Sequence, residues 1–351
     1  MNYDMLKLAV EGLSGGKNTI ILDDRGMPSF MVRIPKYKNS DLISGATENI
    51  HPAFIVDGVE KDEILISKYQ NIVKDDRAYS LPLMDPKVYV DFDQAKQYSE
   101  NKGLGWHLLT NAERAAIALW CKKNGMPRGN NNYGSDYSAP HEKGIETYGG
   151  GDPHQTYRVA TGSGPASWAH DGTTDGIYDL NGNVREWIGG MRLMDGEIQI
   201  IPYNNAAMHV NQDEGSTLWK AILEDGSIVD PGTAGTLKYD ATNADGSGNI
   251  QIGTDVVNQT AEDLYASQTF ETVAAKSGIT VPNILKLLGL APIDSNHGGG
   301  FIYMRNLGER LPNFGGDWSN SSGAGVFSLY LYSPRSASNS NLGFRSAYVD
   351  L

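Results

Sequence analysis

Hydrophobic and polar residues alternate with a period of two near the C-terminus of this chain. Residues 327–332 read FSLYLY, so every second position is apolar and the positions between are Ser or Tyr. This period predicts a β-strand with one face on a core and the other face outward. A second apolar run at 344–349 predicts another strand. We therefore expect a rigid frame that presents Tyr330 and Tyr332 on its outward face.

Helical patterns with clear start and stop signals mark two segments in the first half. One helix is expected at about 93–101, where a glycine follows. The second begins at Thr110, which forms a capping box with Glu113, and ends before Gly125. Shorter expected elements are a helix over 5–13 and strands at 19–22, at 30–35 and on both sides of Asp57-Gly58.

The segment 191–297 is interpreted as an insert in the domain that these helices and strands form. It has hairpin-like pieces and turn-rich stretches, and it predicts a helix at about 261–276 and a short one at about 282–288. The organisation that we expect is an N-terminal extension (1–26), one domain (27–351) with that insert, and a distinct C-terminal segment (315–348).

Charge and composition exclude several classes of protein. The net charge is −13 with no Lys/Arg cluster, which argues against a nucleic-acid partner and against an anionic membrane surface. No run of apolar residues is long enough for a membrane span, so no membrane insertion is expected. The N-terminus lacks the pattern of a signal peptide, so we expect synthesis in the cytoplasm. The single cysteine, Cys121, excludes a disulfide framework and a multi-cysteine zinc site.

Catalytic motifs are weak. The seven histidines never occur at close ligand spacing. The string HGGG at 297–300 matches an oxyanion-hole motif, but the only G-x-S-x-G string, at 12–16, follows a helix and so cannot form a nucleophile elbow. The residues 240–252 resemble a calcium loop without its register of carboxylates. No catalytic constellation is therefore expected.

The C-terminal segment instead has the composition of a recognition surface. Its outward positions are nearly all Ser, Asn or Tyr. Tyr gives a large contact area with few torsions to freeze, while Ser and Asn give adaptable hydrogen bonds. The alternative is an ordinary polar loop, because Ser, Asn and Gly also fill turns without function.

Several motifs resemble those of the formylglycine-generating-enzyme (sulfatase-modifying factor) superfamily. Residues 178–187 (YDLNGNVREW) are similar to its DLxGNVWEW signature. The strings WHLLTNAE at 106–113, GGDW at 315–318 and GFR at 343–345 also have counterparts in that superfamily, in the same order. The resemblance implies a C-type-lectin-like α+β fold with two helices and a twisted, mainly antiparallel sheet. The enzymes carry copper-binding cysteines after the GGDW-like string, and this chain has none there. We therefore expect no enzyme activity.

The C-terminal segment is more closely similar to the variable proteins of diversity-generating retroelements, the major-tropism-determinant-like group. The shared pattern includes AGVF at 324–327, Arg335-Ser336 and GFR at 343–345. In that family a reverse transcriptase rewrites this segment by altering adenines. The resemblance implies a receptor-recognition protein that binds a protein or glycan on a target cell surface. The implied ligand-binding positions are Asp317, Ser319, Asn320, Ser321, Ser322, Tyr330, Tyr332, Ser333, Ala337, Asn339 and Asn341.

Two of these positions, Tyr330 and Tyr332, are expected to be the aromatic anchors. Replacing both with alanine is expected to abolish binding while the domain stays folded. The apolar frame between the face positions supplies the folding energy. Its members are Trp318, Val326, Phe327, Leu329, Leu331 and Phe344.

In some enzymes of the superfamily, a turn like that at 178–187 holds a structural calcium ion. The matching positions here are Asn181, Gly182, Val184 and Glu186. In the alternative interpretation, Glu186 and Arg185 only brace the turn, and no cofactor is bound.

Two other classes of function stay open at this level. One is a residual enzyme of the superfamily. The other is a structural particle subunit, in which a neighbouring chain would cover Tyr330 and Tyr332. The sequence is compatible with a monomer or an oligomer. If the family resemblance holds, the protein reaches a virion or cell surface by assembly.

Overall fold

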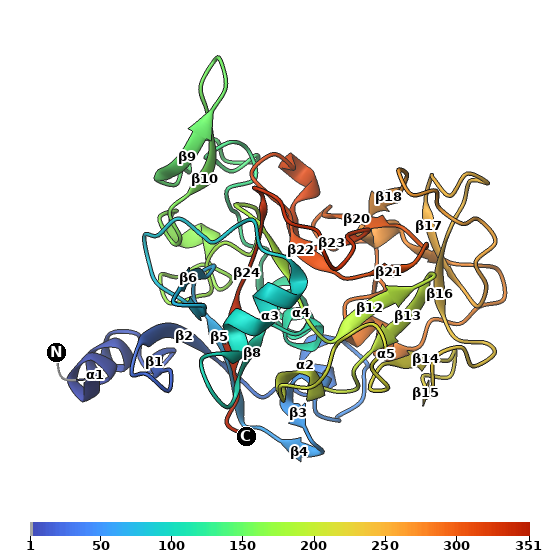
Figure 1. The fold of residues 1–351 in the computed structure, drawn as a ribbon, viewed down its shortest axis with the longest axis horizontal. Coiled ribbons are helices and arrows are strands. Elements are labelled where there is room, and N and C mark those ends of the chain that lie inside the picture. Colours follow the sequence, from blue (N-terminus) through green and yellow to red (C-terminus); the bar gives the residue numbers. More distant parts are fainter. Residues whose placement is uncertain (1–2) are drawn as a thin grey trace.

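Residues 3–351 are described by a computed structural model (Figure 1). Residues 1 and 2 of the predicted N-terminal extension lie outside the described residues. The helices are α1 (Tyr3–Leu13), α2 (Asn39–Leu42), α3 (Phe92–Glu100), α4 (Asn111–Asn124) and α5 (Asn283–Leu287). Few helices and mainly antiparallel sheets make up the fold, so the α+β class predicted from the sequence is confirmed.

A five-stranded antiparallel sheet joins the two ends of the chain. Its order is β1 (Asn18–Leu22), β2 (Pro28–Pro35), β5 (Glu63–Ser67), β25 (Ser346–Tyr348) and β8 (Trp106–Leu108). The last strand, β25, lies between β5 and β8, where Ala347 pairs with Ile66 on one side and with His107 on the other. The chain therefore closes on itself, and the predicted N-terminal extension is hydrogen-bonded to the domain through β1 and β2.

A six-stranded mixed sheet carries the C-terminal segment. Its order is β18 (Ala266–Thr269), β20 (Phe301–Met304), β23 (Gly325–Leu331), β22 (Asn313–Gly315), β11 (Arg185–Trp187) and β24 (Leu342–Phe344). The strand predicted at 327–332 is the central strand β23, which is parallel to β20 and antiparallel to β22. Figure 1 shows β22 and β23 beside β20 and β18, near the middle of the molecule.

Seven strands of the segment 191–297, together with β21, form a third, eight-stranded sheet, at the right of Figure 1. It does not stand apart from the rest of the chain. Its strand β12 also pairs with β21, which follows the segment, and β18 within the segment pairs with β20 of the six-stranded sheet. The strands are β12 (Met191–Met194), β13 (Glu197–Ile200), β14 (Lys220–Ile222), β15 (Ile228–Val229), β16 (Lys238–Ala241), β17 (Ile250–Gly253), β19 (Ala274–Ala275) and β21 (Glu309–Arg310).

The helix predicted at about 261–276 is wrong. This stretch forms β18, a 3-10 turn and β19. Ala266 and Gln268 face inward and pair with β20, so tertiary strand pairing decides the conformation rather than local helical propensity. The short helix predicted at about 282–288 is confirmed as α5.

The predicted capping box of α4 is present and buried. The Thr110 side chain accepts a hydrogen bond from the Glu113 amide at 3.2 Å, and the Glu113 carboxylate accepts one from the Thr110 amide at 3.0 Å. The same carboxylate accepts from His107 and from Asn204 of the 191–297 segment. Cys121 is buried within α4. The cap thus joins the helix to two other parts of the fold.

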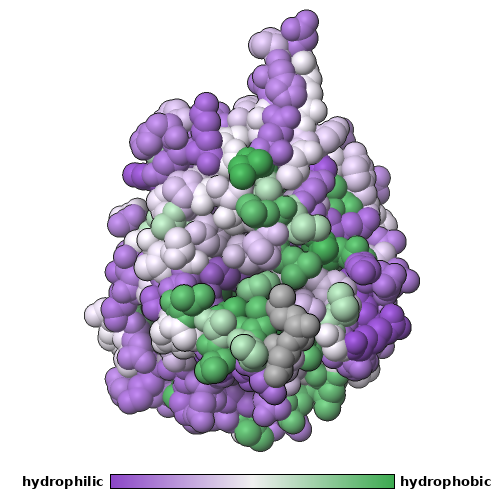
Figure 2. Space-filling model, turned by 90° about the vertical axis from the view of Figure 1, so that its left-hand side faces the viewer, coloured by the Kyte–Doolittle hydropathy of each residue, from purple (hydrophilic) through white to green (hydrophobic). Residues whose placement is uncertain are grey.

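A hairpin projects from the body of the protein. It consists of β9 (Glu146–Gly150) and β10 (Gln155–Val159), and Figure 2 shows it standing above the rest of the surface. Two smaller hairpins are β3 (Ile55–Val56) with β4 (Val59–Glu60) and β6 (Ile72–Lys74) with β7 (Arg77–Tyr79). No helix among residues 3–351 is long and apolar enough to span a membrane.

Candidate binding surface

Strand β23 separates a buried apolar face from a tyrosine-bearing face, as its alternation predicts. Phe327, Leu329 and Leu331 are buried in the main hydrophobic core. On the opposite face, Tyr330 pairs with Tyr303 of the parallel strand β20. Two neighbouring strands therefore place aromatic rings side by side on one surface.

Four tyrosines form a continuous aromatic cluster there, which we call the tyrosine face. The rings of Tyr303 and Tyr330 are stacked with centroids 4.6 Å apart, and Tyr265 stacks on Tyr332 at 5.5 Å. Tyr303 also meets Tyr265 and Tyr332 edge-on, at 5.6 and 6.2 Å. Offset-stacked and edge-to-face pairs at such distances stabilise each other beyond the area that they bury. The cluster is consequently a firm platform.

A buried polar group supports these rings from below. The guanidinium of Arg185 lies 4.7 Å from the centre of the Tyr330 ring and donates a 2.8 Å hydrogen bond to the Tyr332 hydroxyl. It also contacts Asp317 at 3.5 Å and donates to Asn341 at 2.9 Å. Burial alone would lower the pKa of Arg185, but Tyr332 and Asp317 raise it above its usual range. The charge of Arg185 is therefore kept and balanced inside the protein.

Three positions expected on the outward surface are buried, so their predicted exposure is wrong. Asp317, Tyr330 and Ser333 are each 3% exposed. Asp317 accepts hydrogen bonds from Ser319 and Asn341, and Ser333 accepts one from the buried Asn313. Tyr330 lies between the Tyr303 ring and Arg185. A period of two gives the side of the sheet on which a residue lies, but not what covers that side.

The other predicted positions are accessible. Ser319, Ser322 and Asn339 are exposed, and the remainder are half-buried, namely Asn320, Ser321, Tyr332, Ala337 and Asn341. The predicted positions therefore lie in β23 and in the two loops that precede and follow it.

The loop 317–322 is held by a second loop, 128–137. The Ser321 amide donates to the Asn131 carbonyl, and the Tyr133 amide donates to the Trp318 carbonyl, both at 2.8 Å. The Trp318 ring stacks on Tyr157 of the projecting hairpin, with centroids 5.6 Å apart. The long loop after α4 thus supports the predicted ligand-binding loop.

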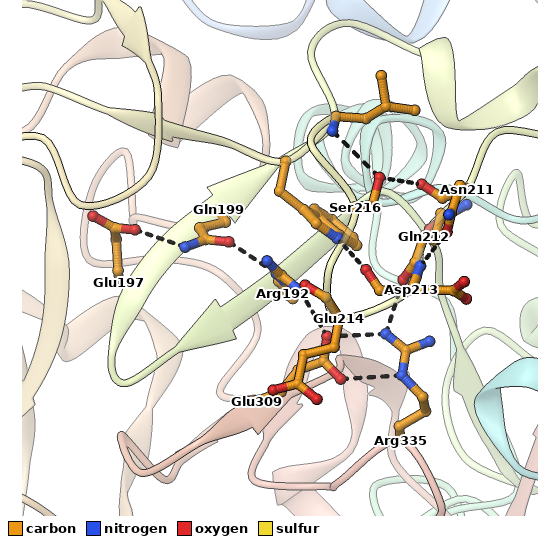
Figure 3. A network of polar contacts seen from close by, with 12 residues as sticks. Arg192, Glu197, Gln199, Asn211, Gln212, Asp213, Glu214, Ser216, Glu309 and Arg335 are labelled. Carbon is orange, nitrogen blue, oxygen red and sulfur yellow. Dashed lines mark hydrogen bonds and ion pairs between the residues drawn. The ribbon is translucent and has the colours of Figure 1, made fainter.

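The loop 333–341 is fixed by Arg335, which reaches into the network of Figure 3. Its guanidinium binds both carboxylate oxygens of Glu309, at 2.9 and 3.0 Å, and donates to the Gln212 carbonyl at 2.8 Å. Arg192 binds the same Glu309 carboxylate at 2.9 Å. The second loop is therefore anchored to the 191–297 segment.

Sequence reasoning missed Tyr265 and Tyr303. Tyr265 lies in the stretch predicted to be helical, and it is 45% exposed. Tyr303 alternates with buried residues in β20, whose sequence FIYM has the same period of two as β23. That alternation was a usable signal, whereas nothing in the sequence places Tyr265 beside Tyr332.

In the turn that resembles a calcium site, the Glu186 carboxylate and the Val184 carbonyl are engaged by protein groups. Both carboxylate oxygens of Glu186 accept hydrogen bonds from Arg345, and one also accepts from Gln70 at 2.9 Å. Gln70 donates to the Val184 carbonyl as well, at 2.9 Å. A guanidinium therefore neutralises the carboxylate that a calcium ion would use. Among residues 3–351 there is no group of three or more His, Cys, Asp or Glu that could hold a metal ion.

Comparison with known proteins gives structural likenesses only. No protein-family model matches this sequence, and no curated protein matches it. Variable protein 1 of Treponema denticola has 12% identity and a TM-score of 0.33, with 94% of this chain and 98% of that chain covered. PvdO from Pseudomonas aeruginosa has 16% identity and a TM-score of 0.30, with 94% and 97% covered. The P3c variant of the Major Tropism Determinant has 11% identity and a TM-score of 0.31, with 94% and 71% covered. At these TM-scores, the function has to be inferred from the geometry of this chain.

Proposed function

We propose that this protein is a non-catalytic recognition protein that binds a partner through the tyrosine face and the loops 317–322 and 333–341. The observation that carries the proposal is the aromatic cluster in which the accessible rings of Tyr265, Tyr303 and Tyr332 pack with the buried Tyr330, bordered by two anchored loops rich in Ser and Asn. Rigid aromatic rings beside small polar side chains are the composition of natural paratopes.

The internal charge balance supports this function. Arg185 and Asp317 contact each other beneath the rings, so their opposite charges balance. The tyrosine face therefore presents aromatic rings and hydroxyls to a partner and no unbalanced charge. A partner that settles on it leaves no uncompensated charge buried in the contact. The only cysteine also supports a non-catalytic function, because burial raises the pKa of the Cys121 thiol and keeps it protonated at neutral pH.

We propose further that the segment 315–348 is diversified, as in the variable proteins that it resembles. The support is that this segment divides into buried core residues and accessible residues. Val326, Phe327, Leu329, Leu331 and Phe344 are buried core residues, while eight of the eleven implied positions are accessible. Residues outside the core can change without loss of the folding energy that the frame supplies. Sequencing the DNA that flanks the gene tests this proposal. A near-copy of the coding segment that differs almost only at adenines, next to a reverse-transcriptase gene, is the expected result.

A display library tests the recognition function without knowledge of the natural partner. The library randomises the eight accessible positions and is selected on yeast for binding to hen lysozyme. We expect most members to stay folded and a fraction to bind. The matched control library randomises the three buried positions, Asp317, Tyr330 and Ser333, and we expect most of its members to unfold. If the first library unfolds as often as the second, the assigned face is wrong.

A further inference from the structure

A cavity lies beside the loop 317–322, between it and the loop 126–138. Its volume is about 360 Å³, at the lower end of the range of ~300–1,000 Å³ that is typical of ligand pockets. Such a volume suits one small ring rather than a chain segment. The side chains that line it and matter here are Arg128, Tyr137, Ser138, Asn181, Ser321 and Ser322.

The wall formed by the loop 126–138 is pre-organised by hydrogen bonds. The buried Asp136 carboxylate accepts five of them, from the Gly129, Ser138 and Ala139 amides, the Ser138 hydroxyl and the Asn131 side chain. Asn131 in turn donates to Asn181 at 3.1 Å. Polar groups held in place before binding cost little entropy when a ligand arrives.

Several groups on this cavity keep free hydrogen-bonding capacity. Within residues 3–351, the hydroxyls of Ser321, Ser322 and Tyr137 make no hydrogen bond to another protein group. Tyr137 lines the cavity and is 54% exposed, so its ring is accessible to a ligand. The cavity thus combines an aromatic wall with several neutral donors and acceptors.

The charges around the cavity disfavour an anionic ligand. Arg128, the cation on the wall, is paired with Glu142 at 2.5 Å, and Asp136 adds a negative charge. The lining is also too polar for an aliphatic side chain, which would leave these groups unpaired.

We propose that this cavity binds one neutral pyranose residue of a glycan on the target surface. The ring face of the sugar would stack on Tyr137, and its hydroxyls, each both donor and acceptor, would pair with Ser321 and Ser322. This inference deepens the proposed function and rests on it, because Ser321 and Ser322 belong to the segment proposed to be diversified. Rewriting their codons would change the sugar that fits, while the wall formed by the loop 126–138 stays constant.

The experiment uses the full chain and three probes: methyl α-D-mannoside, methyl β-D-galactoside and methyl β-D-glucoside. Saturation-transfer NMR is expected to show binding of at least one of them, with Kd on the order of 1 mM for a ligand of this size. We expect Tyr137→Ala, which removes the stacking wall, and Ser322→Trp, which fills the cavity from an exposed position, to weaken that binding at least tenfold.

Two matched controls lie elsewhere. Tyr203 is 49% exposed and lines a different cavity, and Ser277 is an exposed serine outside this cavity and outside both proposed binding loops. Tyr203→Ala and Ser277→Trp are expected to keep the affinity. The proposal is overturned if none of the probes binds at concentrations up to about 50 mM, or if the two cavity variants bind as tightly as the controls. Either result would leave the lysozyme selection unaffected, so this failure is distinct from failure of the proposed function.

Discussion

The guanidinium of Arg345 engages both carboxylate oxygens of Glu186, with its Nη2 2.6 Å from Oε1 and its Nε 2.5 Å from Oε2. Neither side chain is more than 1% exposed. Arg345 comes from the last tenth of the chain and Glu186 from the middle, so this ion pair fixes β11 beside the junction of β24 and β25. Glu186 is also one of the four positions that the motif resemblance assigns to calcium.

The first prediction concerns this pair. Glu186→Gln should lower the free energy of unfolding by about 3 kcal/mol, since it leaves a buried guanidinium without its counter-charge. Urea unfolding measures the loss. The double variant Glu186→Leu/Arg345→Met should recover part of it, because an apolar pair leaves no charge buried. EDTA should leave the Tm of the unmodified protein unchanged. A Tm that falls with EDTA and is restored by calcium would show that the turn does bind the ion.

Asp179 gives a prediction with a definite sign in pH. Burial raises the pKa of this carboxyl to about 6, although the Gly162 amide and Arg345 act in the opposite direction. The folded state therefore binds the proton more tightly than the unfolded state, whose Asp has a pKa near 3.8. The stability that protonation contributes is fully present below pH 3.8, the pKa of the unfolded state, and is lost as pH rises through about 6.

Asp179→Asn should consequently stabilise the protein at pH 7.5. The gain should be up to about 3 kcal/mol, because the pKa of Asp179 differs by roughly two between the folded and unfolded states. The advantage should shrink toward pH 4. The backbone φ of +63° suits Asn as well as Asp. Thermal melts over this pH range check the result. Asp171→Asn is the matched control with opposite sign. The pKa of Asp171 is lowered despite its partial burial, by hydrogen bonds from Thr173 and Lys17.

Removal of a tyrosine hydroxyl should have different effects on stability at two positions of the tyrosine face. The buried Tyr330 hydroxyl has no hydrogen-bond partner within residues 3–351, so Tyr330→Phe should be neutral or stabilising by up to about 1 kcal/mol. Tyr332→Phe removes the acceptor of a buried arginine and should cost about 1–2 kcal/mol. Chemical unfolding of the two variants in parallel measures both changes. Equal losses would contradict the assignment of their hydroxyl environments.

The burial of Tyr330 also changes the expected effect of alanine. Tyr330→Ala opens a cavity between Tyr303 and Arg185 and should cost about 3 kcal/mol or more of stability. The sequence-based expectation that Tyr330 and Tyr332 can both be truncated without harm to the fold therefore does not hold for Tyr330. Tyr265→Ala is the safer probe of binding, because that ring is exposed.

Arg335 is predicted to control the mobility of the loop 333–341. Arg335→Lys keeps the positive charge but loses the bidentate contact with Glu309. Lysine at this position should therefore not hold the loop in its native conformation. Hydrogen exchange of this loop should become faster in Arg335→Lys and in Arg335→Ala. Lys220→Ala removes an exposed ion pair with Asp230 and serves as the control with no expected change in the loop.

Local pattern determined much of this fold. The alternation at 327–332 gave β23 and its buried face, and the capping box of Thr110 and Glu113 gave α4. These elements could be predicted because the period of a strand and the cap of a helix are properties of neighbouring residues. The same pattern gave the side of the sheet on which the candidate binding residues lie.

Only the tertiary structure decided which of those residues meet solvent. Tyr330 is covered by Tyr303 from another strand, and Asp317 is buried in contact with Arg185. Tyr265 joins the platform because β18 pairs with β20, against the helical preference assigned to its stretch. Contacts between positions far apart in the chain depend on how the sheets pair and close. Hydrophobic periodicity carries no information about that pairing. The sequence by itself therefore determined the strand and helix elements and their buried residues, and the tertiary structure determined which candidate binding residues are accessible.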